Sequence, residues 1–264
     1  MQPSSLSAVP GCELVVARYD ENLQWTRIFN RCRLTVYNKG RYTLAECRAR
    51  VAHLSAPHCA TVLPLPNVGR ESHTYLHHIV QRYDTLASTT IFFQDQGAIN
   101  SRVEQRLARA DSYMNNSENS FFGNHVRVAQ DPFNWRWYPS RTRYPRNGNA
   151  TRSMSAYTLG EFFTKVLHRK YVSNVDYQRS LKGTRNRRRG EPGPVRWVPG
   201  AYFSVGRNLV HRNPRQYYKH IPNATNLTLC ADPEEIHYME RAWMAIFQPQ
   251  RKPQPKQIIE LRKP

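Results

Sequence analysis

The segment Asn67-Val-Gly-Arg-Glu71 combines polar and charged side chains that could bind a ligand, and it precedes a helical pattern of apolar residues. The free N–H groups at the start of a helix bind phosphate or carboxylate. Gly69 permits close approach of the backbone, and Arg70 adds a fork of hydrogen-bond donors. The same residues also fit an ordinary loop and helix start in which Glu71 stabilises the first turn. The segment therefore predicts either an anion-binding turn or a plain helix cap.

Asp95 is the second candidate, because it follows the apolar run 89–93 and lies between Gln94 and Gln96. A carboxylate at the tip of a strand can hold a divalent cation that bridges a diphosphate. Mn²⁺ or Mg²⁺ is therefore a candidate cofactor, with Asp95 as its ligand. A single carboxylate makes a weak metal site, and a turn residue before Gly97 explains Asp95 as well.

Two further positions offer a cation and a base. Lys39, in Asn38-Lys39-Gly40, could reach a phosphate as a point charge, although a reverse turn explains this tripeptide equally. Glu240 lies three residues from both His237 and Trp243 in a helical pattern, on the border of the apolar stripe. Glu240 could act there as a general base or could pair with an arginine on the surface.

Two histidine positions have a spacing that can bind metal, since His73 and His77 are four residues apart in one helical pattern. No HExxH pattern accompanies them, so packed or solvated histidines are the preferred interpretation.

The elements that would position these residues follow from the apolar pattern. Short apolar runs at 14–17, 34–37 and 89–93 predict strands, and the periodicity after residue 71 predicts a helix. Alternating strands and helices predict a parallel sheet. The fold class is therefore α/β: a mixed, mostly parallel sheet flanked by helices. The later elements expected are a helix at 159–167, a strand-like segment at 197–205, a short helix from 213 and an amphipathic helix at 233–247.

The expected organisation is one α/β domain over residues 13–248, preceded by a disordered segment 1–12 and followed by a flexible tail 249–264. Arginine-rich stretches at 98–152 and 179–196 are expected to be basic insertions or loops.

The charge of the chain indicates the kind of partner it binds and says little about the fold. The 264 residues carry a net charge of +20, which favours phosphate-bearing partners such as nucleic acid, activated substrates or an anionic surface. The mean hydropathy is −0.72, and no run of about 18 apolar residues occurs, so no membrane-spanning helix is expected. No signal peptide is recognised. The oligomeric state is not predicted.

The five cysteines are scattered and form no CxxC pair, so zinc is not expected. We expect reduced thiols in a cytoplasmic protein. Four Asn-x-Ser/Thr sequons, at Asn115, Asn149, Asn223 and Asn226, are interpreted as chance matches.

Several of these segments together resemble a widespread and poorly characterised domain-of-unknown-function family. The resemblance covers roughly residues 13–96 and 197–247 and is fairly specific for the family. The segments that carry it are Val15–Trp25, Tyr37–Gly40, Leu65–Ile79, Phe92–Gln94, Pro199–Arg207 and Tyr238–Trp243. The shorthand of its motifs is NKG, LPNxGRExxxYLxxI and YMERxW.

That family in turn resembles GT-A-type glycosyltransferases, which implies a GT-A-like fold and transfer of a sugar from a nucleotide-sugar donor to a hydroxyl acceptor, such as a glycan. The resemblance implies Glu240 as base, or less favourably Glu235, and Asp95 as the residue at the strand tip. The site it implies for the donor and its phosphates comprises Arg18, Asp20, Asn38, Lys39, Asn67, Gly69, Arg70, Glu71 and Arg207. The chain departs from the pattern, since Gln94-Asp95-Gln96 has one carboxylate where two are usual, so the resemblance does not extend to the pair of carboxylates that holds the metal ion.

The alternative function is binding of nucleic acid or another polyanion by a non-catalytic α/β core. Residues 179–219 carry 11 Lys or Arg against one acidic residue, Glu191. Such a surface binds phosphates without needing an active site.

Overall fold

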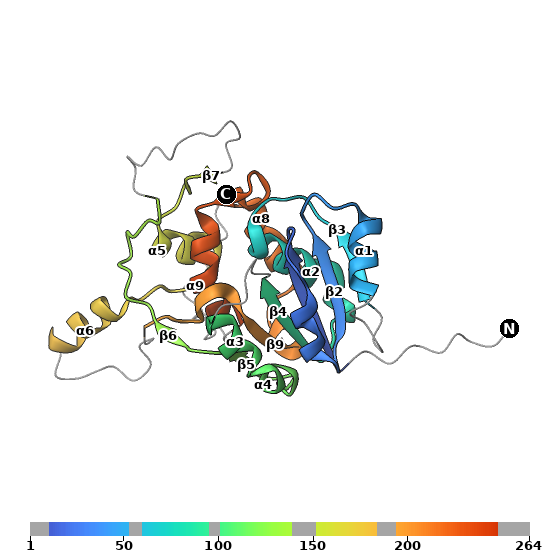
Figure 1. Cartoon of the computed structure of the whole chain (residues 1–264). Coiled ribbons are helices and arrows are strands. Elements are labelled where there is room, and N and C mark those ends of the chain that lie inside the picture. Colours follow the sequence, from blue (N-terminus) through green and yellow to red (C-terminus); the bar gives the residue numbers. More distant parts are fainter. Residues whose placement is uncertain (1–10, 53–59, 95–100, 139–151, 184–193, 248–264) are drawn as a thin grey trace.

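The structure of the protein is a computed structural model that describes residues 11–52, 60–94, 101–138, 152–183 and 194–247 (Figure 1). Asp95, the arginine-rich run Arg185–Arg189, the first ten residues and the tail from 249 lie outside these ranges.

A six-stranded sheet with the order β3-β2-β1-β4-β9-β5 forms the centre of the fold. Strands β3, β2, β1 and β4 are parallel, β9 is antiparallel to β4, and β5 is antiparallel to β9. The predicted mixed, mostly parallel sheet is confirmed. Its strands are β1 (Cys12–Arg18), β2 (Arg33–Asn38), β3 (Ala60–Pro64), β4 (Thr89–Gln94), β5 (Phe121–Gly123) and β9 (Phe203–Gly206).

The alternation of side chains along β1 explains how both faces of the sheet are buried. Leu14 and Val16 belong to one hydrophobic cluster, and Val15 and Ala17 belong to the other. The first cluster includes residues of η1, α1, α3 and α4, and the second includes residues of α2, α8 and α9. In Figure 1 the red helix α9 stands between the sheet and the yellow-green segments around α5 and β7.

The helices are distributed along the whole described chain. The α-helices are α1 (Leu44–Ala52), α2 (Arg70–Arg82), α3 (Ser101–Leu107), α4 (Ala110–Met114), α5 (Leu159–Glu161), α6 (Asn174–Gly183), α7 (Arg207–Val210), α8 (Arg215–Asn223) and α9 (Glu235–Phe247). The 3₁₀ helices are η1 (Gln24–Phe29), η2 (Tyr83–Thr85), η4 (Pro199–Ala201) and η5 (Asn226–Thr228), and η3 (Phe162–Val166) is a π-helix. The remaining short strands are β6 (Arg127–Val128), β7 (Arg152–Ser153), β8 (Arg196–Trp197) and β10 (Asp232–Pro233). Across the described ranges, no helix is both long enough and apolar enough to cross a membrane.

The expectation that all cysteines are reduced thiols is wrong, because Cys12 and Cys32 form a disulfide. Cys12 begins β1 and Cys32 precedes β2, and the next residues, Glu13 and Arg33, are paired in the parallel register. Strand pairing therefore brings the two thiols together, which spacing in sequence alone could not indicate.

The described part of the stretch 98–152 belongs to the central fold, in contrast to the expected long insertion. Its strand β5 forms one edge of the sheet beside β9. Leu107, Ala110 and Tyr113 are buried in the same cluster as Leu14 and Val16. Local composition indicated an insertion because Arg and Asn dominate this stretch, while its burial depends on contacts with distant strands.

A buried carboxylate ties the first two strands to α2. Glu13 is fully buried and accepts hydrogen bonds from Arg33 Nη2 at 2.5 Å and Thr35 Oγ1 at 2.6 Å. Nε2 of the fully buried His78 lies 3.8 Å from the same carboxylate. Burial acts to raise the pKa of Glu13, but His78, Arg33 and Thr35 together hold it below the ordinary value. The charge is therefore compensated inside the core.

Candidate functional site

The order of the strands identifies one edge of the sheet as the place for a site. From β1 the chain moves outward through β2 to β3, and it then crosses to β4 on the other side of β1. Ligands of open α/β sheets bind outside the carboxyl ends of the strands at such a reversal of strand order. Ala17 pairs with Gln94 in the register, so the carboxyl ends of β1 and β4 meet there. We call this the carboxyl edge.

Arg18 and Asn38 hold the carboxyl ends of β1 and β2 together. The Arg18 side chain is buried and donates to Asn38 Oδ1 at 3.0 Å and to the Glu21 carbonyl at 3.0 Å. Asn38 Nδ2 donates to the Tyr42 carbonyl at 2.7 Å. Both residues lie at the predicted place, but these contacts make them supports of the edge.

Asp20 also lies beyond β1, where it accepts hydrogen bonds from the backbone N–H and from Nε of Arg41, at 3.1 and 3.0 Å. The pair fixes the loop after β1 to the turn after β2.

Lys39 is a second buried cation of the edge and is only 7% exposed. Its Nζ donates to the carbonyls of Val68 and Arg70, at 2.6 and 2.5 Å. Burial lowers the pKa of Lys39 to about 7, and the nearby Glu71 carboxylate opposes this shift. Lys39 therefore ties the end of β2 to the turn before α2.

The predicted anion-binding turn is largely occupied by the chain itself. Gly69 has a φ of +56°, and a Cβ there would lie 2.3 Å from the Leu227 carbonyl oxygen, so only glycine fits. The Gly69 N–H donates to the Cys230 carbonyl at 2.8 Å. The close approach expected at Gly69 is therefore to the segment before α9. Asn67 is exposed, and Arg70, half exposed, pairs with Asp232 at 3.1 Å.

Glu71 is buried beside this turn and carries a perturbed carboxyl group. Burial raises its pKa to about 7, its own backbone N–H and Arg70 oppose the rise, and the charge of Glu240 adds to it. The influence of Lys39 also lowers the pKa. Glu71, Lys39 and Glu240 thus form one electrostatic group, although they come from α2, the end of β2 and α9.

Glu240 reaches the carboxyl edge through the loop before β9. Its Oε1 accepts a hydrogen bond from the Gly200 N–H, and the Gly200 carbonyl accepts one from Gln94 Nε2 at 3.0 Å. Gly200 has a φ of +80°, and its neighbour Ala201 has a φ of +52°, which is uncommon for a residue with a side chain. The Ala201 carbonyl accepts a hydrogen bond from Tyr75 of α2 at 3.2 Å. Three segments therefore hold this strained loop between β4 and Glu240.

Arg106 of α3 adds a cation next to the same loop. Its guanidinium lies 3.9 Å from the ring centroid of Tyr202, and Nη2 donates to the Pro199 carbonyl at 3.4 Å. The sequence did not indicate Arg106 or Gly200 as site residues, nor the hydrogen bond from Gln94 to the Gly200 carbonyl. The Pro199-Gly200 dipeptide was a usable turn signal, but nothing local connected it to Glu240.

Arg207 is the predicted site residue that the structure does not bring to this edge. Strand β9 runs antiparallel to β4, and Gly206 pairs with Thr89 at the amino end of β4. Arg207 follows Gly206 and pairs there with Glu118 at 2.8 Å.

Asp95 lies outside the described residues. Glu235 is buried and accepts from the Asn226 N–H at 3.5 Å, away from the Gly200 loop.

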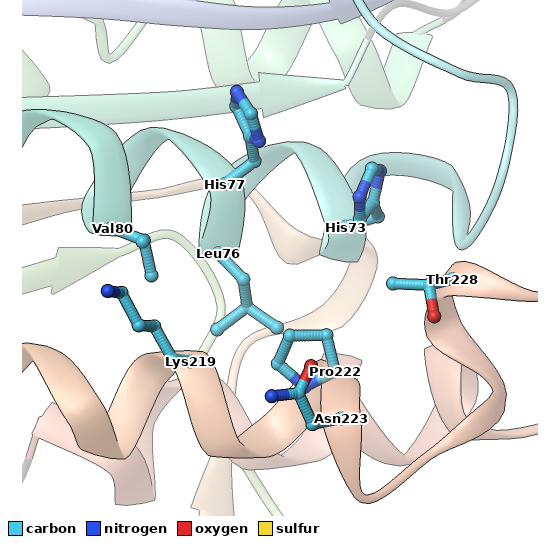
Figure 2. A pocket seen from close by; sticks show the side chains of 8 residues that line it. All are labelled: His73, Leu76, His77, Val80, Lys219, Pro222, Asn223 and Thr228. Atoms are coloured by element: carbon cyan, nitrogen blue, oxygen red, sulfur yellow. The ribbon is translucent and has the colours of Figure 1, made fainter.

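A cavity of about 230 Å³ lies between α2 and α8 (Figure 2). Leu76, Val80 and Pro222 give it an apolar lining, with His73, His77, Lys219, Asn223 and Thr228 as its polar residues. Burial lowers the pKa of His73 to about 4 and also lowers that of His77, so both imidazoles are neutral at pH 7. We favour the carboxyl edge as the reactive site because the cavity has no lining residue from a strand end and no carboxylate.

The described residues offer no fit for a protein-bound metal ion. Over the described ranges no three His, Cys, Asp or Glu side chains come together as metal ligands. The carboxylates of Asp20, Glu71 and Glu240 at the edge all have hydrogen-bonding or electrostatic partners in the chain.

A protein-family model described as "Protein of unknown function (DUF3431)" matches residues 14–259. No curated protein and no solved structure matches the chain.

Proposed function

The chain belongs to this family of proteins of unknown function, and we propose that it is a glycosyltransferase that uses a nucleotide-sugar donor at the carboxyl edge. The observation that carries the proposal is the position of Glu240. A carboxylate from α9 is held beside the strand-order reversal by a loop that is itself bonded to the end of β4.

The reaction requires a general base close to the acceptor hydroxyl and a site that binds the departing diphosphate. The acceptor hydroxyl oxygen forms a bond to the anomeric carbon while the bond from that carbon to the diphosphate oxygen breaks. Glu240 takes the hydroxyl proton, and the diphosphate leaves with the electron pair of the broken bond. Glu240 is half-buried, and its hydrogen bond to Gly200 fixes one carboxylate oxygen.

Two arginines are suited to the negative charge of the leaving group. Arg70 is half exposed, and Arg106 lies against the Gly200 loop. Arginine presents several donors in a fork that matches phosphate oxygens. Lys39 and Arg18 are buried and engaged with backbone and side-chain oxygens, so their role in this proposal is to position the loops.

Mn²⁺ or Mg²⁺ enters the proposal only as an experimental variable. The described residues supply no set of ligands for it, and Asp95 lies outside them. No step above depends on a metal ion.

The test is calorimetric binding of a panel of nucleoside diphosphates and nucleotide-sugars to the full chain, with and without Mn²⁺. We expect at least one donor to bind and the Arg70→Gln variant to bind it about ten- to a hundredfold more weakly, because one charge-assisted contact contributes about 1.5–3 kcal/mol. Arg41→Gln is the matched control, since Arg41 is exposed and pairs with Asp20 on the same side of the fold. A folded protein that binds none of the common donors would exclude the proposal.

The net charge of +20 favours one second candidate, binding of nucleic acid or another polyanion. A salt titration of RNA and DNA binding separates the two functions. Tight binding with a steep salt slope that is unchanged in Arg70→Gln and Glu240→Gln would favour this candidate.

A further inference from the structure

The disulfide between Cys12 and Cys32 carries information about the compartment of the protein. Both sulfurs are buried, and the bond joins the starts of two central strands. Structural disulfides persist in oxidising compartments and are rare where thiols are kept reduced. The disulfide therefore weighs against the cytoplasmic location expected from sequence and changes the meaning of the Asn-x-Ser/Thr sequons.

Two of the four sequons present an accessible asparagine. Asn115 directly follows α4 and is exposed, and Asn223 is the exposed last residue of α8. Asn226 is half-buried, and its Nδ2 donates to the Met154 carbonyl at 3.0 Å. Asn149 lies outside the described residues.

We propose that the chain is N-glycosylated at Asn115 and Asn223 in the oxidising compartment where the Cys12–Cys32 disulfide forms. The modification requires the side-chain Nδ2, a free path to solvent and the hydroxyl residue two positions later. Ser117 and Thr225 supply the hydroxyl.

The chemistry is a transfer from a lipid-linked oligosaccharide diphosphate. A bond forms between Nδ2 and the anomeric carbon, the bond from that carbon to the diphosphate oxygen breaks, and Nδ2 loses one proton. Disulfide formation is a separate step, in which the two thiols give two electrons and two protons to a disulfide-carrying oxidant.

The contacts of Asn115 suit this modification. Its Oδ1 accepts from Arg31 Nη2 at 3.3 Å, and within the described part of the chain its Nδ2 makes no hydrogen bond. Arg31 and its other partner, Asp111, are themselves 56% and 84% exposed, so this surface contact is weak.

Asn223 stands at the wall of the cavity between α2 and α8, and Figure 2 shows its side chain beside Pro222. Its side chain is exposed and makes no hydrogen bond to the described residues, so a glycan on Nδ2 displaces no hydrogen bond to them. At Asn226 a glycan would break the bond to Met154, so we expect no glycan there.

The test uses the full chain with its own N-terminus, produced in eukaryotic cells and analysed by intact mass before and after peptide N-glycosidase. All proteins carry Asn149→Gln, which removes the sequon outside the described residues. We expect two glycans on this protein, one on Asn115→Gln, one on Asn223→Gln and two on Asn226→Gln.

Variants of the hydroxyl residue separate loss of the sequon from loss of the fold. Ser117→Ala is expected to remove the glycan at Asn115, and Ser117→Thr to retain it. A chain without a glycan at Asn115 or at Asn223 overturns the proposal, whatever the state of its thiols. Neither asparagine lies at the carboxyl edge, so donor binding and glycosylation succeed or fail independently.

Discussion

The substitution Glu71→Gln tests the electrostatics of the carboxyl edge. Glu71 is 9% exposed, and its pKa is about 7 where the ordinary value is 4.5, chiefly because burial disfavours the charged carboxylate. Glutamine keeps the size of the side chain and removes the titration. The free energy of unfolding of the variant should therefore lack the pH dependence that protonation of Glu71 gives the wild type.

The sign and size of the effect follow from the two pKa values. Between pH 4.5 and pH 7 the folded protein keeps the Glu71 proton that the unfolded chain has released. The favourable contribution is complete below pH 4.5 and is lost as the pH rises to 7. Each unit of difference between the two pKa values corresponds to about 1.4 kcal/mol. The free energy of unfolding of the wild type should therefore fall by about 3 kcal/mol relative to Glu71→Gln.

Urea denaturation of both proteins at several pH values from 4.5 to 7.5 measures this difference. Glu46→Gln is the matched control, since Glu46 is exposed and hydrogen bonds from Thr43 hold its pKa below the ordinary value. Because Glu46→Gln keeps Glu71, its free energy of unfolding should fall with pH as that of the wild type does. A wild-type curve parallel to that of Glu71→Gln would refute the assigned burial and charge of Glu71.

Three further substitutions test other parts of the account. Burial lowers the pKa of Lys39 from 10.5 to about 7. Between pH 7 and pH 10.5 the unfolding free energy of the wild type should therefore rise by about 5 kcal/mol relative to Lys39→Met. An equal pH dependence of the unfolding free energy in the two proteins would contradict this. Glu13→Gln should cost about 3 kcal/mol in the same assay, because it leaves the partners of a buried carboxylate uncompensated. Cys12→Ser should lower the unfolding free energy by about 3 kcal/mol, because the disulfide joins residues 20 positions apart. A matching loss after Cys47→Ser, a free buried cysteine, would assign that effect to packing instead.

The elements that sequence predicted well are those with a strong local pattern. The runs at 14–17, 34–37 and 89–93 are buried strands because they are apolar, rich in β-branched or aromatic residues and bounded by polar residues. The helical periodicity after residue 71 corresponds to α2, whose Tyr75, Leu76 and Ile79 are fully buried. Strand β5 has only three residues and depends on β9 across the fold, so no local signal indicated it.

The candidate site was harder to predict because its contacts join distant segments. Lys39 and Glu71 were recognisable as charged residues at the ends of elements, but their interactions with the turn before α2 and with Glu240 of α9 required the fold. The direction of β9 decided the place of Arg207, and no residue near it in sequence encodes that direction. Glu240 was singled out by its position on α9, while its contact with Gly200 required the fold.

The location of a bound nucleoside diphosphate tests the central proposal most directly. A crystal structure of the full chain soaked with a nucleoside diphosphate should place the two phosphates at the carboxyl edge, beside Arg70 and Arg106 and next to Glu240. A diphosphate bound instead in the cavity between α2 and α8, or on a basic surface away from Glu240, would contradict the proposal.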